Sequence, residues 1–336
     1  MEPYWDACRH TGYGRALTLA VQGIYGIDDI HRDTIEELSD RFQKALTSGN
    51  HFDYVLKEKS KIKVSLLDSH LGCDRRFFRS VYRIEALLAP SHHRELRAYK
   101  EEFGITVSSL RDWKEVAKLK LEKVLDAGAV ALKCGLAYTR SLRFNKVAEA
   151  EAEIEFYRFF EDCHLPDWRP GVGPSHKLQD HMMHYLLKLA DERGLTIQFH
   201  TGLQEGNGNF IYDSNPELLC NLFAEYTDIK FDIFHMGYPY QQTLSALAKN
   251  FPNVYIDMAW GHLISPVASV NALVEWLDAF PANKISAFGG DYCFVDGVYG
   301  HQLLARQNVA QALAIKVDAG IFDLSRAKEI ATWLFV

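Results

Sequence analysis

Two histidines and one aspartate stand where short apolar segments of the sequence end. His200 closes the run at residues 195–199, His235 closes the run at 230–234, and Asp291 follows the run at 285–290. Each lies in or beside a glycine-bearing turn. Imidazole and carboxylate groups are the ligands by which proteins hold a hydrolytic zinc ion. We therefore expect a divalent metal site at these residues, with Zn²⁺ as the first choice and Mn²⁺ as the second.

The alternative for any single one of these residues is a hydrogen-bonded polar group in the core, which is the commoner fate of a lone histidine at a strand end. Three ligand-type side chains at three strand ends favour a shared site instead. Asp291 carries most weight, because a carboxylate at the end of an apolar strand is costly to bury unless it meets a cation. We expect His200, His235 and Asp291 to meet in one cavity.

Further charged and aromatic residues suggest where a substrate would bind. Lys133 lies inside the apolar run 130–136, where it could bind a substrate carboxylate, be carboxylated into a metal ligand, or extend to solvent at the rim. Arg83 and Glu85 share one strand face by the period of two, as a substrate clamp or a structural ion pair. Tyr138 and Arg140 could hold an anionic substrate, or belong to an ordinary solvated loop.

Strand and helix signals alternate along most of the chain, which is the pattern of a parallel sheet wrapped by helices. Strands are expected at residues 63–67, 80–88, 129–136, 195–200, 230–235, 254–258 and 285–291. Helices are expected at 15–25, 33–46, 52–57, 109–126, 146–160, 177–193, 216–226, 241–250, 266–280, 299–319 and 324–334. In a parallel α/β barrel the carboxyl ends of the strands form one active face.

We predict one domain over residues 1–336, with a helical segment at 1–60 and strands two to eight of an α/β (TIM) barrel, its first strand missing, at 61–336. A doubly wound sheet is the alternative. It usually carries a glycine-rich phosphate turn after its first strand, and neither GxGxxG nor GxxxxGK[ST] occurs in the sequence.

Composition and charge exclude some classes of binding partner. The chain has 37 Lys and Arg against 44 Asp and Glu, for a net charge of −7, and no stretch concentrates positive charge, which argues against nucleic acid and anionic membrane. No apolar run approaches the roughly 20 residues of a spanning helix, and the first residues lack a signal-peptide pattern. Six scattered cysteines without a CxxC pair indicate reduced thiols in the cytoplasm. The sequence is compatible with a homo-oligomer.

Four motifs together resemble the amidohydrolase superfamily. They are the segments 131–140 (ALKCGLAYTR), 199–202 (FHTG), 234–239 (FHMGYP) and 289–292 (GGDY). The resemblance is closest to the amidohydrolase-related (amidohydrolase 2) branch, which includes the domain fused to glutamine-synthetase-like enzymes. It implies a metal-dependent (β/α)8 barrel in which His200 is a ligand, His235 a ligand or catalytic imidazole, and Asp291 a ligand that accepts the proton of the metal-bound water.

The sequence departs from this family at its start. It contains no HxH motif, which in the family supplies two metal ligands from the first strand, and it begins in the helices that follow that strand in relatives. We interpret this as a truncated reading frame in preference to a degenerate paralogue. The chain as given is accordingly expected to bind metal weakly.

The sequence thus predicts a metal-dependent hydrolase acting on a small polar, carboxylate-bearing substrate, in which metal-bound hydroxide attacks a carbonyl. Decarboxylation or a uronate-isomerase-like aldose–ketose isomerisation on the same barrel is an alternative, since fold does not settle the reaction. A third possibility is that the chain is an inactive binding module.

Overall fold

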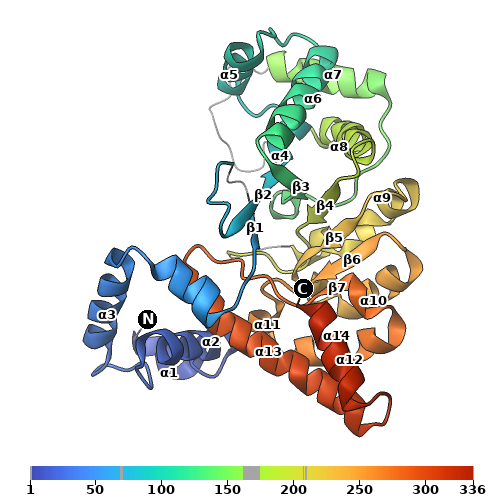
Figure 1. Cartoon of the computed structure of the whole chain (residues 1–336). Helices are drawn as coiled ribbons and strands as arrows, with labels where there is room; N and C mark the ends of the chain where they lie inside the picture. The colour runs from blue at the N-terminus through green and yellow to red at the C-terminus, as the bar shows by residue number, and fades with distance from the viewer. Residues whose placement is uncertain (1, 69–70, 162–174, 207, 209, 336) are drawn as a thin grey trace. The chain divides into compact units, whose positions relative to one another are not determined.

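The computed structural model of the chain describes residues 2–68, 71–161, 175–206, 208 and 210–335 (Figure 1). Its seven described strands form one sheet, in which hydrogen-bonded neighbours follow the order of the sequence. The register of β2 with β3, of β3 with β4 and of β6 with β7 is parallel. The strands are β1 (Ser65–Asp68), β2 (Phe78–Arg83), β3 (Ala129–Cys134), β4 (Thr196–Phe199), β5 (Phe231–Ile233), β6 (Val254–Asp257) and β7 (Ile285–Ser286).

From β2 onward, helices connect successive strands, as a parallel sheet requires. Two agree with the sequence prediction at both ends, α10 (Gln241–Asn250) and α14 (Leu324–Leu334). The others that follow β1 are α4 (Glu85–Leu88), α5 (His93–Phe103), α6 (Leu110–Asp126), α7 (Glu149–Glu161), α8 (His176–Asp191), α9 (Cys220–Glu225), α11 (Gly261–Ile264), α12 (Pro266–Ala279) and α13 (Val295–Asp318).

Helix α6 shows why these segments are helical. Ser109 accepts a hydrogen bond from the Asp112 N–H while the Asp112 carboxylate accepts one from the Ser109 N–H, so both ends of a capping box are present. The apolar residues then recur at helical spacing and are buried along one face, Leu110, Trp113, Val116, Leu121 and Val124. Local capping and burial of one stripe therefore specify the helix together.

The N-terminal segment is helical, as predicted. It contains α1 (Glu2–Cys8), α2 (Gly12–Ala20) and α3 (Ile35–Thr47), with π-helical turns at Val21–Tyr25 and Asp53–Lys59. Helix α2 packs closely against α13: a Cβ on Gly300 would lie 1.9 Å from the Ala16 carbonyl oxygen. Glycine at this position allows the two backbones to approach.

The contacts divide the chain into two compact units. The first comprises residues 1–65, 233–250 and 255–336, and the second comprises 66–232 and 251–254. The core of the first includes Leu263, Leu304 and Trp276, and that of the second includes Trp113, Phe199 and Phe223. The prediction of a single domain stays a prediction, and each unit is described below by itself.

Three element predictions require correction. The strand predicted at 80–88 ends at Arg83, because Ile84 bonds to the Lys133 carbonyl and residues 85–88 turn into α4. The strand predicted at 285–291 is regular only at 285–286, and Gly289, Gly290 and the left-handed Asp291 (φ 52°) belong to the loop that follows. Helix α5 was not predicted, because its sequence is mostly polar.

Two further observations bear on the sequence analysis. Among the described residues, no helix combines the length and hydropathy needed to cross a bilayer. Cys8, Cys73, Cys134, Cys220 and Cys293 carry free thiols, and Cys163 lies outside the described residues.

Candidate functional site

His235 and Asp291, two of the three predicted ligands, lie close together in the first unit. The His235 Nε2 atom is 3.9 Å from the Asp291 Oδ2 atom. The imidazole is almost fully buried, whereas the carboxylate is 51% exposed, so the pair has one side toward solvent. His235 Nδ1 lies 2.8 Å from the Ala259 carbonyl oxygen. A carbonyl can only accept, so Nδ1 carries a proton, and Nε2 is the ring atom that faces Asp291.

The backbone at this edge of the sheet is strained. Of the non-glycine residues described, five have a left-handed backbone, and four of these follow β5, β6 or β7: His235, Met236, Trp260 and Asp291, with φ between 47° and 62°. Such a conformation costs on the order of 1–3 kcal/mol per residue and persists where the surrounding structure enforces it, typically at functional sites. Both predicted ligands of this unit are among the four.

Asp257 supports this arrangement from the end of β6. Its Oδ1 atom accepts the Ala259 N–H at 2.6 Å, which closes a turn of the kind that aspartate favours. The Ala259 carbonyl then holds His235. Asp257 is only 9% exposed, and it was not identified from the sequence.

Two more buried histidines, His262 in α11 and His301 in α13, belong to the same unit. His262 donates from Nε2 to the Ala287 carbonyl and accepts at Nδ1 from Asn308, and burial lowers its pKa to about 4. Burial also lowers the pKa of His301 to about 3, and its ring is surrounded by aromatic side chains, with the Phe288 centroid at 5.0 Å. Both rings are therefore neutral at physiological pH.

In the second unit, Lys133 belongs to a polar row across three strands. It is 4% exposed and stands in register with Gln198 of β4. The Gln198 side chain donates to the Asp232 carboxylate of β5 at 3.0 Å. Burial raises the pKa of Asp232 to about 6, against the opposing effects of the Gln198 hydrogen bond and the Lys133 charge. Lys133 thus shares one sheet face with a carboxylate that attracts it.

His200 and Tyr138 come together in the same unit. His200 follows β4 and is 5% exposed, and the Tyr138 ring lies 4.6 Å from it, centroid to centroid. The Nε2 atom of His200 lies 3.3 Å from the Leu203 carbonyl. The phenol of Tyr138 accepts the Glu205 N–H at 3.4 Å. Tyr138 is therefore adjacent to a predicted ligand, as a substrate-binding residue would be.

Arg83 and Glu85 are paired, with 3.2 Å between Nε and Oε1. Asp68, at the end of β1, lies 3.4 Å from the same guanidinium. Glu85 also accepts the Gly135 N–H, and it lies in α4, so the predicted common strand face is wrong while the ion pair is present. Through the contacts with Asp68 and Gly135, this ion pair links β1, β2 and the residue that follows β3.

The hydrogen bonds of Arg140 are all made within the chain. Its guanidinium is buried, and its five N–H groups have five acceptors: the carbonyls of Ser141, Arg143 and His176, the amide oxygen of Gln179, and the carboxylate of Asp180 at 2.6 Å. A guanidinium has five donors. Arg140 therefore anchors its loop to α8 and has no donor left for a substrate.

The donors of the first unit fit a divalent metal ion in part. In a tetrahedral zinc site, ligand atoms about 2.0–2.2 Å from the ion lie about 3.3–3.6 Å from one another, and the His235–Asp291 separation of 3.9 Å exceeds this by a few tenths of an ångström. The bond from Nδ1 to the Ala259 carbonyl is the support that metal-binding histidines commonly have. Within the described part of the chain, no group of three or more His, Cys, Asp or Glu side chains is arranged to hold a metal.

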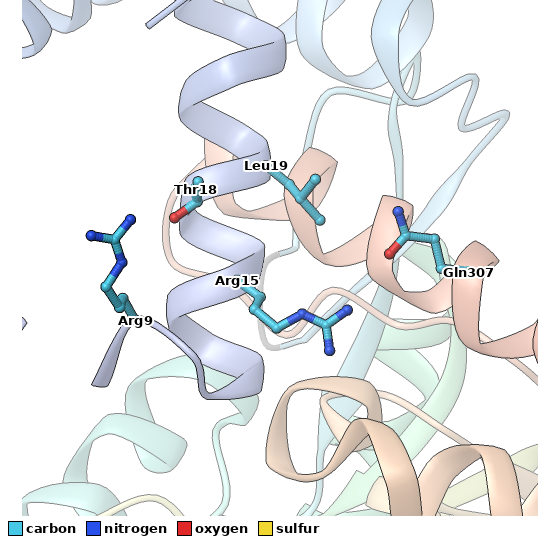
Figure 2. A pocket seen from close by; sticks show the side chains of 5 residues that line it. All are labelled: Arg9, Arg15, Thr18, Leu19 and Gln307. Carbon is cyan, nitrogen blue, oxygen red and sulfur yellow. The ribbon is translucent and has the colours of Figure 1, made fainter. Parts of the chain in front are cut away.

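Two cavities lie away from these residues. One, of about 340 Å³, is lined by Arg9, by Arg15, Thr18 and Leu19 of α2, and by Gln307 of α13 (Figure 2). The other, of about 280 Å³, lies in the N-terminal segment beside Tyr25 and His51. Neither is lined by a predicted site residue.

A family model described as amidohydrolase matches residues 91–323. This range includes β3 to β7 and the candidate residues from Lys133 to Asp291. The chain belongs to the amidohydrolase family. The predicted family is thereby confirmed, and with it the fold class, a parallel α/β barrel sheet of which seven strands are described.

This amidohydrolase is similar in sequence to one named protein and in structure to others. It is 26% identical over 292 residues to protein fluG of Emericella nidulans, covering 80% of this chain but 32% of fluG. The chain thus spans about a third of that curated relative. Uronate isomerase from Thermotoga maritima superposes with a TM-score of 0.80 at 17% identity, covering 99% of this chain and 78% of the isomerase.

A protein described as a metal-dependent hydrolase, from Lactobacillus casei, gives a TM-score of 0.65 at 20% identity, over 96% of this chain and 89% of that protein. At these identities the two structures support the fold of the amidohydrolase and leave its reaction open.

Sequence reasoning missed Asp232, although the signal was present. An aspartate inside the apolar run 230–234 invites the same argument that singled out Lys133, because a charged residue in a buried strand needs a partner. His262 and His301 offered no comparable signal, since each lies in a helix whose burial only the fold determines.

Proposed function

We propose that this amidohydrolase is a metal-dependent hydrolase that acts on a small polar substrate bearing a carboxylate. The supporting observation is the His235–Asp291 pair, in which a backbone carbonyl orients the imidazole and the Nε2 atom lies 3.9 Å from a half-exposed carboxylate. His235 and Asp291 would hold the metal, Zn²⁺ or Mn²⁺. His200, which also follows a strand of the sheet, is proposed as a further ligand from the family resemblance.

When bound, the divalent ion supplies Lewis acidity and a nucleophilic water at neutral pH. The residues of the chain supply the rest. Asp291 accepts a proton at its exposed carboxylate during attack on the substrate carbonyl and returns it to the leaving group. His235 keeps its orientation through Nδ1 and the Ala259 carbonyl, so its Nε2 atom stays directed at the reacting groups.

Lys133 is proposed to attract the substrate carboxylate. The Lys133 charge and the Asp232 carboxylate attract each other, and carboxylation would remove the positive charge of the lysine, so this attraction supports the substrate role over the carboxylated ligand. Tyr138, whose ring packs on His200, is proposed to line the same substrate site. Arg83 and Glu85 are proposed to position β1 and β2 beneath it.

Product analysis tests the proposal. The protein is incubated with Zn²⁺ or Mn²⁺ and a panel of amides, lactones, carboxylic acids and uronates, beside the Asp291→Asn variant. Hydrolysis that depends on the metal and on Asp291 supports it. Release of CO₂, or conversion of a uronate to a ketose, assigns one of the alternative reactions. No turnover, together with no metal bound, assigns the inactive binding module.

The setting of the reaction is also a proposal. The free thiols agree with the cytoplasm expected from the sequence. A homo-oligomer is compatible with the chain, and sedimentation of the purified protein would decide it.

A further inference from the structure

A buried carboxylate at the start of α13 joins the N-terminal helical segment to the loop that carries Asp291. Asp296 lies in the first turn of α13 and is 5% exposed. The Tyr25 hydroxyl and the His51 Nε2 atom both donate to its Oδ1 atom, the latter at 2.8 Å. Tyr25 and His51 are themselves buried. A carboxylate removed from water needs such donors, so the three side chains hold one another in place.

Backbone hydrogen bonds hold the loop between β7 and α13 at two points. Its residues 287–294 form no helix or strand. At its start the Ala287 N–H bonds to the Leu334 carbonyl at 2.8 Å, and in its middle the Gly289 carbonyl accepts the Trp260 N–H at 3.3 Å. Two consecutive glycines then precede Asp291, whose left-handed φ of 52° is costly for an aspartate. The conformation of Asp291 must be imposed from outside the loop.

The first turn of α13 is in direct contact with the residue after Asp291. A Cβ on Gly297 would lie 2.5 Å from the Tyr292 ring, so the ring rests on the helix backbone beside Asp296. The Tyr292 ring also packs on Trp260, with 4.8 Å between centroids. A shift of this helical turn would therefore move Tyr292 and, through the backbone, Asp291.

We propose that Tyr25 and His51 are positioning residues for the active site: by holding Asp296 they fix the first turn of α13, and with it the backbone of Asp291. The proposal rests on the proposed role of Asp291. The N-terminal helical segment would then help to set the position of Asp291 in the proposed site.

A second link between the N-terminal segment and α13 provides a matched control. Arg306 donates from Nη2 to the Ser60 carbonyl at 3.1 Å. It lies about 15 Å along the helix from Asp296, at 1.5 Å per residue. Loss of this link loosens the same two elements at a distance from Asp291. The comparison separates positioning of Asp291 from general bracing of the helix.

The cavity of about 280 Å³ lined by Tyr25 and His51 allows a chemical test of the same contact. When His51 is replaced by alanine, free imidazole can enter through this cavity and restore the donor to Asp296. His51→Gln offers a second restoration, because its amide nitrogen can reach the place of Nε2.

The experiment is hydrogen exchange of the peptides that cover residues 287–295 in the full chain. His51→Ala is expected to accelerate their exchange by about tenfold, since the bond lost is one to a charged group. Imidazole or His51→Gln should reverse most of the change, and Tyr25→Phe should give a smaller change in the same direction. Arg306→Ala should lower the melting temperature without affecting these peptides.

Unchanged exchange at 287–295 in both His51→Ala and Tyr25→Phe would overturn the proposal, as would an equal effect of Arg306→Ala. Tyr25→Phe removes a single hydroxyl, so it serves if His51→Ala fails to fold. Zn²⁺ affinity of the same variants separates the two proposals. Faster exchange with unaltered Zn²⁺ binding supports the positioning and counts against Asp291 as a metal ligand.

Discussion

The Nε2 atom of His235 and the Oδ2 atom of Asp291 lie 3.9 Å apart, although they follow strands β5 and β7, which are separated in the sheet by β6. Both residues have a left-handed backbone. The Ala259 carbonyl holds the His235 ring, and Asp291 lies in the loop that leads into α13. This pair is the part of the candidate site that the structure describes most completely.

The first prediction concerns metal binding by this pair. His235→Ala and Asp291→Ala should each weaken Zn²⁺ binding by at least about tenfold, and the double variant should be little weaker than the worse single one, because ligands of one ion act as a unit. Competition with a chelator measures the affinity. His31→Ala, which removes an exposed histidine, is the control. Full affinity in both single variants would place the metal elsewhere.

The second prediction concerns Asp232 and pH. Its folded-state pKa, about 6, lies above the ordinary value of 3.8, so the folded protein holds this proton more tightly than the unfolded chain. Stability relative to Asp232→Asn should therefore fall by about 1–3 kcal/mol as pH rises from 4 to 6, and stay level above 7. Urea unfolding of both proteins measures it. Parallel stability curves would show that Asp232 titrates normally.

The third prediction concerns the charge of Lys133. Lys133→Met leaves Asp232 without its cation, and at pH 8 this should cost about 3–5 kcal/mol of unfolding free energy. The loss should be smaller at pH 5, where Asp232 is largely protonated, and smaller again when Asp232→Asn is added. Val130→Met on the same strand, at a 44% exposed position, should be near neutral. A loss independent of pH would argue against the charge interaction of Lys133 with Asp232.

The fourth prediction separates structural from substrate contacts at Arg140. Arg140→Ala should destabilise the protein by about 3–5 kcal/mol, because Asp180 keeps a buried charge without its partner. Arg140→Lys should recover only part of the loss, since an ammonium cannot reproduce five donors in a plane. KM of the folded variants should match the parent. A raised KM at unchanged stability would restore the substrate role.

The fifth prediction concerns the contact of α2 with α13. Glycine to alanine normally favours a helix by roughly 1 kcal/mol, but at Gly300 the new Cβ would meet backbone atoms of Ala16 at 1.9 Å. Gly300→Ala should therefore destabilise the protein by about 1–3 kcal/mol, while Gln307→Ala, at an exposed position of the same helix, should not. A raised melting temperature would mean that the two helices separate readily.

Much of the secondary structure could be predicted from the sequence. The bounds of α10 and α14 agree with the prediction at both ends, because caps and a 3.6-residue apolar period act within a few residues. The strands of the parallel sheet were also expected, and the family motifs identified the strand ends that carry His200, His235 and Asp291. The strand predicted up to Asp291 was too long, since two glycines and a left-handed turn follow Ser286.

The contacts of the charged side chains depended on the fold. In the sequence, Arg140 is a cation in a predicted loop. In the structure, its guanidinium donates a hydrogen bond to the Asp180 carboxylate of α8. In the sequence, Asp232 is one polar residue within an apolar strand. In the structure, strand register places Lys133 beside Gln198, and the Gln198 side chain donates a hydrogen bond to Asp232.

The sequence by itself determined the family, the alternation of strands and helices, and the residue types of the site. Only the tertiary structure decided which side chains meet. Tyr25 and Asp296, for example, are 271 residues apart in the sequence and share a hydrogen bond. Helix and strand signals arise from interactions within one or two turns, whereas a contact of this range depends on how the packed elements bring distant backbones together, which no local pattern encodes.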